Sequence, residues 1–143
     1  MAQKENYFFL ATPLYSFRDD KLVWNQNLQE KWKAVIQALE KENIKVVVAF
    51  RDLDQNKSGE WLRKKEFKLI KNSLGVIVIL GNTPGIYAET GFAKGVGKKL
   101  YGIRTDKLEK MGPKVQNWIE SMFDAVFDSP QELAKYLSDH IKG

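Results

Sequence analysis

Cysteine is absent from the 143 residues of this chain, and histidine occurs once, as His140. The lack of cysteine excludes disulfide bonds, thiolate chemistry and cysteine-based zinc sites. With a lone histidine so late in the sequence, neither a histidine-dependent catalytic triad nor a transition-metal site is expected. The sequence therefore predicts a protein that uses no metal and no cofactor.

Long apolar runs are also lacking. No segment approaches the roughly 20 apolar residues that a membrane helix needs, and the first residues lack the apolar core and the cleavage site of a signal peptide. We therefore expect a cytoplasmic protein without a membrane partner. The length fits one domain over residues 1–143, because domains usually contain about 100–200 residues. A hydrophobic content of 43% is ordinary for a globular protein.

Basic residues outnumber acidic residues in this chain. A formal net charge of +5 and a pI near 9.3 favour anionic partners. Lysines and arginines are spread along the whole chain with acids among them, so a nucleic acid polymer is not the expected partner, whereas a phosphorylated small substrate fits. RNA binding by the basic stretch 61–72 stays open as an alternative, which a steep salt dependence would support.

Strand and helix patterns alternate along the chain. Short β-branched or aromatic runs predict strands over residues 7–11, 44–50, 75–80 and 100–103, with a further short strand near 125–127. Apolar residues at spacings of three and four predict helices over residues 22–42, 61–72, 86–96, 115–123 and 130–141. This alternation predicts an α/β fold: a single-domain, doubly wound, mainly parallel sheet of four to five strands with helices on both faces.

Ligands of such sheets bind beyond the carboxyl ends of the strands, and four segments follow predicted strands here: 12–18, 51–59, 81–89 and 104–113. In the third, Thr83 can cap a helix and Pro84 suits its first turn, while Gly85 lets backbone approach a ligand. Glu89 follows near the positive end of that helix, so we expect an ionised carboxylate. These residues alone leave two readings open, a catalytic nucleophile or a solvated helix carboxylate.

The segment 75–106 resembles the nucleoside 2-deoxyribosyltransferase family, which includes nucleoside 5′-monophosphate N-glycosidases. The family shows a strand, a loop ending in Gly-x-x-x-Glu-x-Gly-x-Ala, a Gly-Lys pair, a second strand and often Arg-Thr-Asp; the matching residues are Gly85, Glu89, Gly91, Ala93, Gly97, Lys98 and Arg104–Asp106. Three other stretches are similar to the family's first loop, its Asn-Leu-Met segment and the start of its last helix: Ala11–Ser16, Gln116–Ile119 and Phe127–Leu133.

The resemblance implies chemistry at the anomeric carbon of a nucleoside or nucleotide. The carboxylate of Glu89 would attack that carbon as the base leaves, and a second base or water would resolve the covalent glycosyl-enzyme with net retention. Glu66, four residues before Ile70, matches the acid that manages the proton on the leaving base. The family residue there is generally Asp, and a surface partner for a nearby lysine is the alternative role for Glu66.

The resemblance also implies substrate-binding residues and an oligomer. Tyr15 matches the first-loop aromatic residue that positions the sugar and the nucleophile, and Thr12, Pro13 and Ser16 belong to the same substrate-binding loop. Asn117 matches an amide that reaches into the neighbouring subunit's site, which implies a homodimer or a higher homo-oligomer. A helix N-cap is the alternative role for Asn117.

One position departs from the transferases of this family, which usually carry Asp six residues before the nucleophile. Here that residue is Thr83, and members that hydrolyse nucleoside 5′-monophosphates have a hydroxyl there to hold phosphate. Arg18 could add a bidentate cation or be a solvated loop charge. Transfer of a (deoxy)ribosyl group between bases is thus the expectation, hydrolysis of a (deoxy)nucleoside 5′-monophosphate is an alternative, and a non-catalytic nucleotide-binding module is a third.

Overall fold

The computed structural model describes residues 6–13, 15–18, 21–24, 26–81 and 83–141, with backbone only for 15–18, 21–23 and 141. In this part of the chain, a five-stranded sheet runs in the order β4-β1-β5-β6-β7. Its strands are β1 (Phe8–Ala11), β4 (Val46–Val48), β5 (Gly75–Ile79), β6 (Lys99–Ile103) and β7 (Ala125–Phe127). All the pairings in this sheet are parallel, which confirms the expected doubly wound α/β fold.

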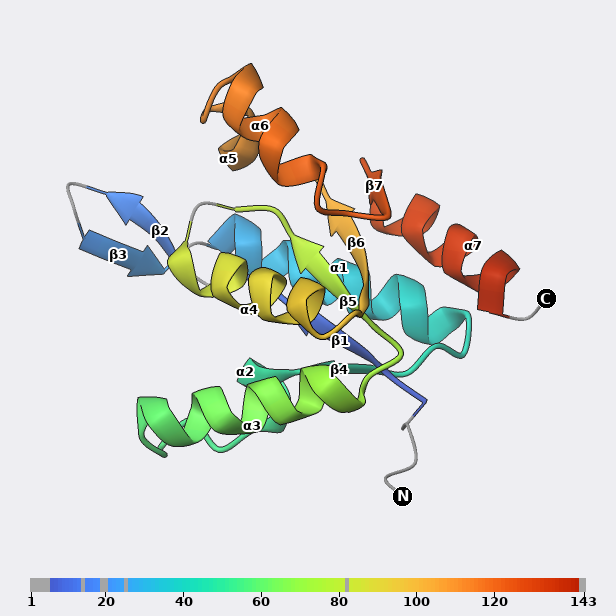
Figure 1. The fold of residues 1–143 in the computed structure, drawn as a ribbon, viewed down its shortest axis with the longest axis horizontal. Helices are drawn as coiled ribbons and strands as arrows, with labels where there is room; N and C mark the ends of the chain where they lie inside the picture. The colour runs from blue at the N-terminus through green and yellow to red at the C-terminus, as the bar shows by residue number, and fades with distance from the viewer. Residues whose placement is uncertain (1–5, 14, 19–20, 25, 82, 142–143) are drawn as a thin grey trace.

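Helices follow the strands and cover both sides of the sheet (Figure 1). In chain order they are α1 (Gln26–Lys41), α2 (Ala49–Asp52), α3 (Gly59–Asn72), α4 (Pro84–Gly95), α5 (Asp106–Glu109), α6 (Pro113–Glu120) and α7 (Pro130–Ile141). None of the helices within the described residues combines the length and the apolar character that a membrane crossing requires.

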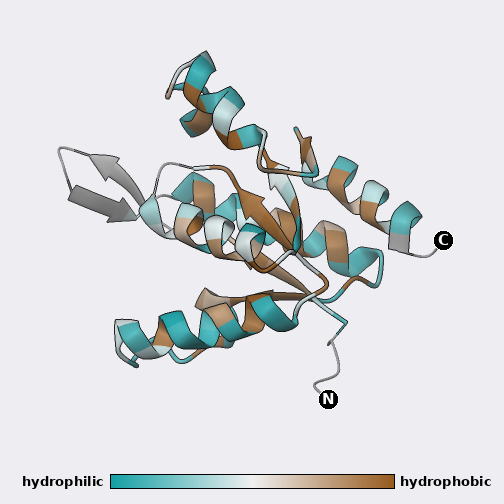
Figure 2. Cartoon of the chain, viewed as in Figure 1, coloured by the Kyte–Doolittle hydropathy of each residue, from teal (hydrophilic) through white to brown (hydrophobic). Residues whose placement is uncertain are grey.

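Alternate residues of the strands point to opposite faces, so the sheet is buried on both sides. Phe8 and Leu10 of β1 pack with α1 and α7, whereas Phe9 and Ala11 pack in a second cluster with residues from α3, α4, α5 and α6. The apolar side chains of β5 are fully buried, and Figure 2 shows the hydrophobic colour concentrated on the central strands. The carboxyl ends of β1, β4 and β5 thus lie side by side in a rigid frame.

Two segments differ from the sequence-based prediction. Residues 22–24, predicted as the start of a long helix, form the end of β3 (Lys21–Trp24), which pairs antiparallel with β2 (Tyr15–Arg18) in a separate hairpin. Residues 49 and 50, predicted as strand, begin the one-turn helix α2. Both errors concern local runs of apolar residues, whose strand or helix state periodicity alone does not decide.

Candidate functional site

A pocket of about 170 Å³ opens at the carboxyl edge of β1 and β4. Its wall combines apolar side chains with two carboxylates and one amide: Phe9, Leu10, Thr12, Val48, Ala49, Phe50, Gln55, Glu66 and Glu89. These residues come from β1 and the position after it, from the end of β4, from α2 and the loop after it, and from α3 and α4. Segments far apart in the sequence therefore converge where ligands of parallel sheets bind.

The packing of α4 on the sheet places Glu89 at the pocket. Thr83 occupies the N-cap position and Pro84 the first turn of this helix, as predicted, although the Thr83 hydroxyl makes no capping hydrogen bond. The face that packs on the sheet carries Ile86, Thr90 and Ala93, all buried. Glu89 lies beside this face and is half-buried at the pocket wall.

The ionisation of Glu89 differs from the sequence-based expectation. Burial raises the pKa of Glu89 to about 8, and the negative charge of Glu66 adds to this effect. The positive end of a helix stabilises a carboxylate by a few tenths to one kcal/mol and acts mainly within the first turn, so desolvation outweighs it. Burial of Glu89 therefore favours its protonated form and opposes the effect of the helix, on which the expectation of an ionised carboxylate was based.

Glu66 shares the pocket with Glu89 because α3 packs on α4. Phe67 of α3 stacks on Phe92 of α4 with ring centroids 4.1 Å apart and ring planes 12° from parallel. Burial raises the pKa of Glu66 as well. No ion pair of Glu66 occurs in the described part of the chain, whereas Glu60 on the same helix pairs with Lys64 at 2.8 Å. The alternative of Glu66 as a surface partner for a lysine thus lacks a partner among these residues.

The first loop meets the third loop at Pro13 and Gly81. Thr12 lines the pocket, and the buried Pro13 lies so close to Gly81 that a Cβ atom built on this glycine would be 2.7 Å from the proline Cγ. The hydroxyl of Tyr87 donates a 2.5 Å hydrogen bond to the carbonyl oxygen of Gly81. Pro13 thus lies against Gly81 and is not among the residues that line the pocket.

The remaining predicted site residues lie elsewhere. The backbone of Tyr15, Ser16 and Arg18 forms β2, and their side chains are outside the described structure. Thr83 and Gly85, at the start of α4, are not among the residues that line the pocket. Asn117 is exposed in the interior of α6, whose N-cap is Gly112, so the N-cap alternative for Asn117 was wrong.

Gln55 and Phe50 also line the pocket, and no motif in the sequence marks either residue. The amide nitrogen of Gln55 donates hydrogen bonds to the carbonyl oxygens of Ala49 (2.8 Å) and Leu53 (3.1 Å), which orients the side-chain oxygen as an acceptor. The available signal was position alone, because residues 51–59 follow a predicted strand. The sequence of a polar loop does not indicate which of its side chains points into the pocket.

No family model matches the chain, and no curated protein matches it in sequence. Solved structures do. A 2-deoxyribosyltransferase from the psychrotolerant bacterium Bacillus psychrosaccharolyticus superposes with a TM-score of 0.68 at 18% identity, over 91% of each chain. This chain shares its fold.

Two further structures agree. The CMP N-glycosidase BcmB of Clostridium botulinum gives a TM-score of 0.62 at 17% identity, over 92% of this chain and 97% of that one. A 2-desoxiribosyltransferase from Leishmania mexicana gives 0.65 at 19% identity, over 95% and 99%. The fold expected from the resemblance is therefore confirmed, and the likeness covers nearly the whole length of each chain.

Proposed function

We propose that this protein is an enzyme that cleaves the N-glycosidic bond of a (deoxy)nucleoside or nucleotide, with Glu89 as its nucleophile. One observation carries the proposal: two half-buried carboxylic acids, Glu66 and Glu89, line one pocket at the carboxyl edge of the sheet, and burial raises both pKa values. Perturbed acids in a cleft are typical of catalytic sites. Similar folds in a deoxyribosyltransferase and a CMP N-glycosidase support this reaction class.

In the proposed mechanism the two acids divide the work. The ionised Glu89 attacks the anomeric carbon, the carbon–nitrogen bond breaks with its electron pair passing to the base, and Glu66 donates a proton to that base. An ester between Glu89 and the sugar results. A second base then attacks the same carbon through a ring nitrogen, releases Glu89 and returns its proton to Glu66, so that configuration is retained.

Because burial favours the protonated form of Glu89, this scheme requires that substrate binding shifts the proton away from Glu89. A sugar that becomes cation-like beside Glu89 favours the carboxylate form, while Glu66 lies in the same pocket and can hold the single proton of the pair. Two interacting acids of this kind titrate as a unit. The catalytically competent state thus carries one proton for two carboxyl groups.

Hydrolysis of a 5′-monophosphate is a second candidate, favoured by the start of α4. Thr83 provides a hydroxyl without a capping bond, and the first turn of the twelve-residue helix directs backbone N–H groups outward, which suits an anion. The net charge of +5 acts in the same direction. A Thr83→Asp substitution would place a carboxylate where the phosphate is proposed to lie and should weaken monophosphates at least tenfold relative to nucleosides. Equal effects on both substrates would remove this candidate.

The deciding experiment supplies nucleosides and 5′-monophosphates, each with and without an added free base, and follows the bases by chromatography. Exchange that requires an acceptor base supports transfer, and release of base from monophosphates without acceptor supports hydrolysis. A protein that turns over no member of this panel would contradict the proposed function and leave a nucleotide-binding module.

We also propose a homodimer in which α6 faces the neighbouring subunit. Trp118 is 68% exposed and Val115 44% exposed, on the helix that also presents Asn117. Exposed large apolar side chains that cluster on one helix are typical of protein interfaces. Light scattering should give twice the chain mass, and Trp118→Lys should shift it toward one chain mass; a wild-type monomer at micromolar concentration would contradict the proposal.

A further inference from the structure

Side-chain hydroxyls hold the segment that follows β5. The backbone N–H of Leu80 donates a 2.9 Å hydrogen bond to the carbonyl oxygen of Ile103, and the hydroxyl of Thr105 donates to the carbonyl oxygen of Leu80. The next carbonyl group belongs to the buried Gly81 and accepts a 2.5 Å hydrogen bond from the hydroxyl of Tyr87. Hydroxyl groups from two other segments therefore satisfy the last two carbonyl oxygens before the loop.

The hydrogen bond of Tyr87 ties the start of α4 back to the end of β5. Tyr87 lies within α4, and Gly81 comes before the N-cap residue Thr83. The tyrosine ring packs against the apolar cluster that includes Ile86 and Ala93. Burial raises the pKa of Tyr87 to about 12, so the hydroxyl keeps its proton, and its role as a donor, throughout the neutral range.

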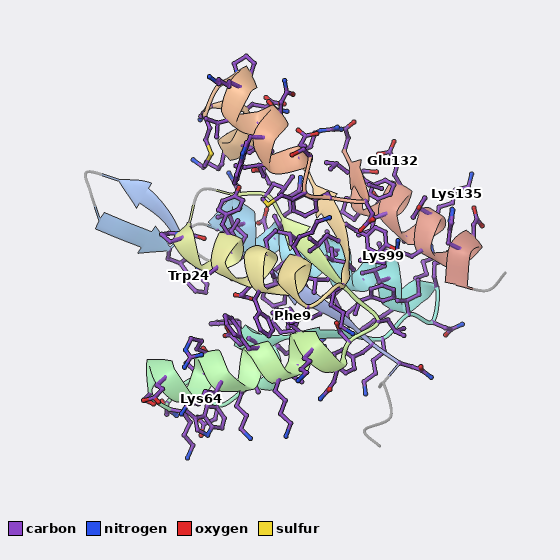
Figure 3. The ribbon with its side chains drawn as sticks, viewed as in Figure 1. Phe9, Trp24, Lys64, Lys99, Glu132 and Lys135 are labelled. Carbon is purple, nitrogen blue, oxygen red and sulfur yellow. The ribbon has the colours of Figure 1, made fainter. Side chains whose placement is uncertain are left out.

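Gly81 also contacts the first loop of the chain. A Cβ atom on Gly81 would be only 2.7 Å from the Cγ atom of Pro13, so the glycine is restrained at its carbonyl by Tyr87 and at its Cα by the proline ring. Thr12, next to this proline, lines the pocket together with Phe9, and Figure 3 shows Phe9 between the sheet and the helices α3 and α4. A continuous set of contacts thus leads from Tyr87 to the pocket wall.

We propose that Tyr87 is a positioning residue of the pocket, because its hydrogen bond to Gly81 fixes Thr12 relative to Glu89. This inference rests on the proposed function, since the spacing affects a rate only if Glu89 attacks a substrate. Tyr87 is not among the residues that line the pocket, but it belongs to the same helix as Glu89. The helix that carries the nucleophile therefore also holds the loop on the other side of the pocket. A displacement of about 1 Å between reacting groups can lower a rate about 100-fold.

The test compares Tyr87→Phe with a matched control, Tyr7→Phe. The hydroxyl of Tyr7 also donates a 2.5 Å hydrogen bond to a backbone carbonyl oxygen, that of Leu69, but Tyr7 precedes β1 and so lies at the opposite, amino edge of the sheet. Each substitution removes one hydroxyl group and keeps the ring in place. Melting temperature, kcat and KM are measured for both variants, together with the amide hydrogen exchange of Thr12 and Gly81 by NMR.

Tyr87→Phe should lower kcat about tenfold with KM within about twofold, because the pocket keeps its lining residues but loses their spacing. The amides of Thr12 and Gly81 should exchange faster. Tyr7→Phe should lower the melting temperature by a similar amount while kcat and both exchange rates stay near those of the wild type. Unchanged kcat in Tyr87→Phe, or an equal loss in Tyr7→Phe, would overturn the positioning role.

The exchange rates separate this inference from the proposed function. If the wild type turns over no substrate, the glycosidic function is contradicted. Faster exchange of Thr12 in Tyr87→Phe, and not in Tyr7→Phe, would then still support the link between Tyr87 and the first loop. Unchanged exchange of Thr12 in Tyr87→Phe would overturn that link whatever the activity.

Discussion

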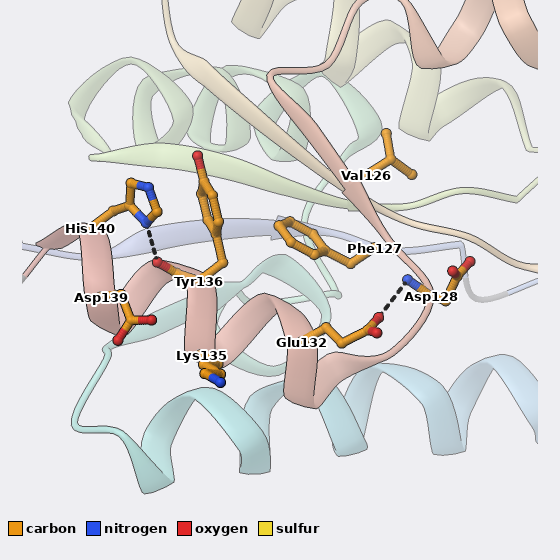
Figure 4. A pocket seen from close by; sticks show the side chains of 8 residues that line it. All are labelled: Val126, Phe127, Asp128, Glu132, Lys135, Tyr136, Asp139 and His140. Atoms are coloured by element: carbon orange, nitrogen blue, oxygen red, sulfur yellow. Dashed lines mark hydrogen bonds between the residues drawn. The ribbon is translucent and has the colours of Figure 1, made fainter.

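Two pockets of this molecule contrast in size and in chemistry. The larger, about 480 Å³, lies between β7 and α7 and is lined by Val126, Phe127, Asp128, Glu132, Lys135, Tyr136, Asp139 and His140 (Figure 4). It contains acids, a lysine, a tyrosine and the histidine, which are residue types that catalysis uses. The smaller pocket, about 170 Å³, holds Glu66 and Glu89.

Several polar groups of the larger pocket make contacts within the fold. Asp128 accepts a 2.9 Å hydrogen bond from Arg104, and Glu132 accepts one from the backbone N–H of Asp128 at 3.2 Å. The imidazole of His140 stacks on Tyr136 with centroids 3.9 Å apart, and its Nδ1 lies 2.7 Å from the Tyr136 carbonyl oxygen. The acids of the smaller pocket are instead desolvated side by side, so an unfavourable carboxylate environment indicates function better than volume or residue type does.

We expect the largest loss of activity from substitution of Glu89 in the smaller pocket. Glu89→Gln keeps the shape of the side chain but removes the nucleophile, so kcat/KM for base release or exchange should fall by about 10³-fold or more. Glu132→Gln and His140→Ala, in the larger pocket, should stay within about twofold of wild type. Full turnover in Glu89→Gln would refute the mechanism, and a large loss in either control would move the site to the other pocket.

The second effect concerns the coupling of the two acids. Because the competent state carries one proton for the two acids, kcat/KM should rise with pH as the first proton leaves the pair and fall as the second leaves, near the pKa of about 8. Glu66→Gln removes the negative charge that raises the Glu89 pKa and leaves one titrating acid, so kcat/KM should rise with a midpoint below about 8 without the later fall, while the maximal rate falls about 100-fold through loss of the proton donor. Glu60→Gln, on the same helix and paired with Lys64, is the matched control. An unshifted profile in Glu66→Gln would contradict the coupling.

The smallest effect is on stability. Glu89 has a folded-state pKa of about 8, above its ordinary value of 4.5, so the folded protein loses stability as pH rises from about 4.5 through 8. Because one pH unit of pKa displacement corresponds to about 1.4 kcal/mol, Glu89→Gln should raise the free energy of unfolding by at least about 1 kcal/mol at pH 8 and by little at pH 5. Urea unfolding at both values measures this, and equal stability at pH 8 would contradict the buried acid.

Much of this fold follows from local patterns in the sequence. The runs at 75–80 and 100–103 are strands because continuous β-branched or aliphatic residues suit a strand covered on both faces. The predicted site residues Thr12, Glu66 and Glu89 also reach one pocket, since the carboxyl ends of parallel strands share an edge. The alternating β–α pattern was sufficient for the fold, whereas the choice of Glu66 and of Glu89 as site residues came from the family resemblance.

Three other features of the fold and the site depend on tertiary contacts that local sequence patterns do not show. Leu22 to Trp24 carry apolar residues compatible with helix or strand, and pairing with β2 decides their state. The protonation of Glu89 is set by desolvation from neighbouring elements, which a sequence position within a helix does not report. Phe50 lines the pocket because β4 ends at Val48 and the chain turns at once into α2, a change within an unbroken apolar run.

The close contact between Pro13 and Gly81 limits which residues position 81 can accept. A single methyl group at position 81 would act as a wedge, since its atom would stand 2.7 Å from the proline ring, and it would force apart the segment that carries Thr12 and the one that leads into α4. Thr12 and Glu89 therefore do not vary independently. A substitution that displaces either segment should also change the distance between Thr12 and Glu89.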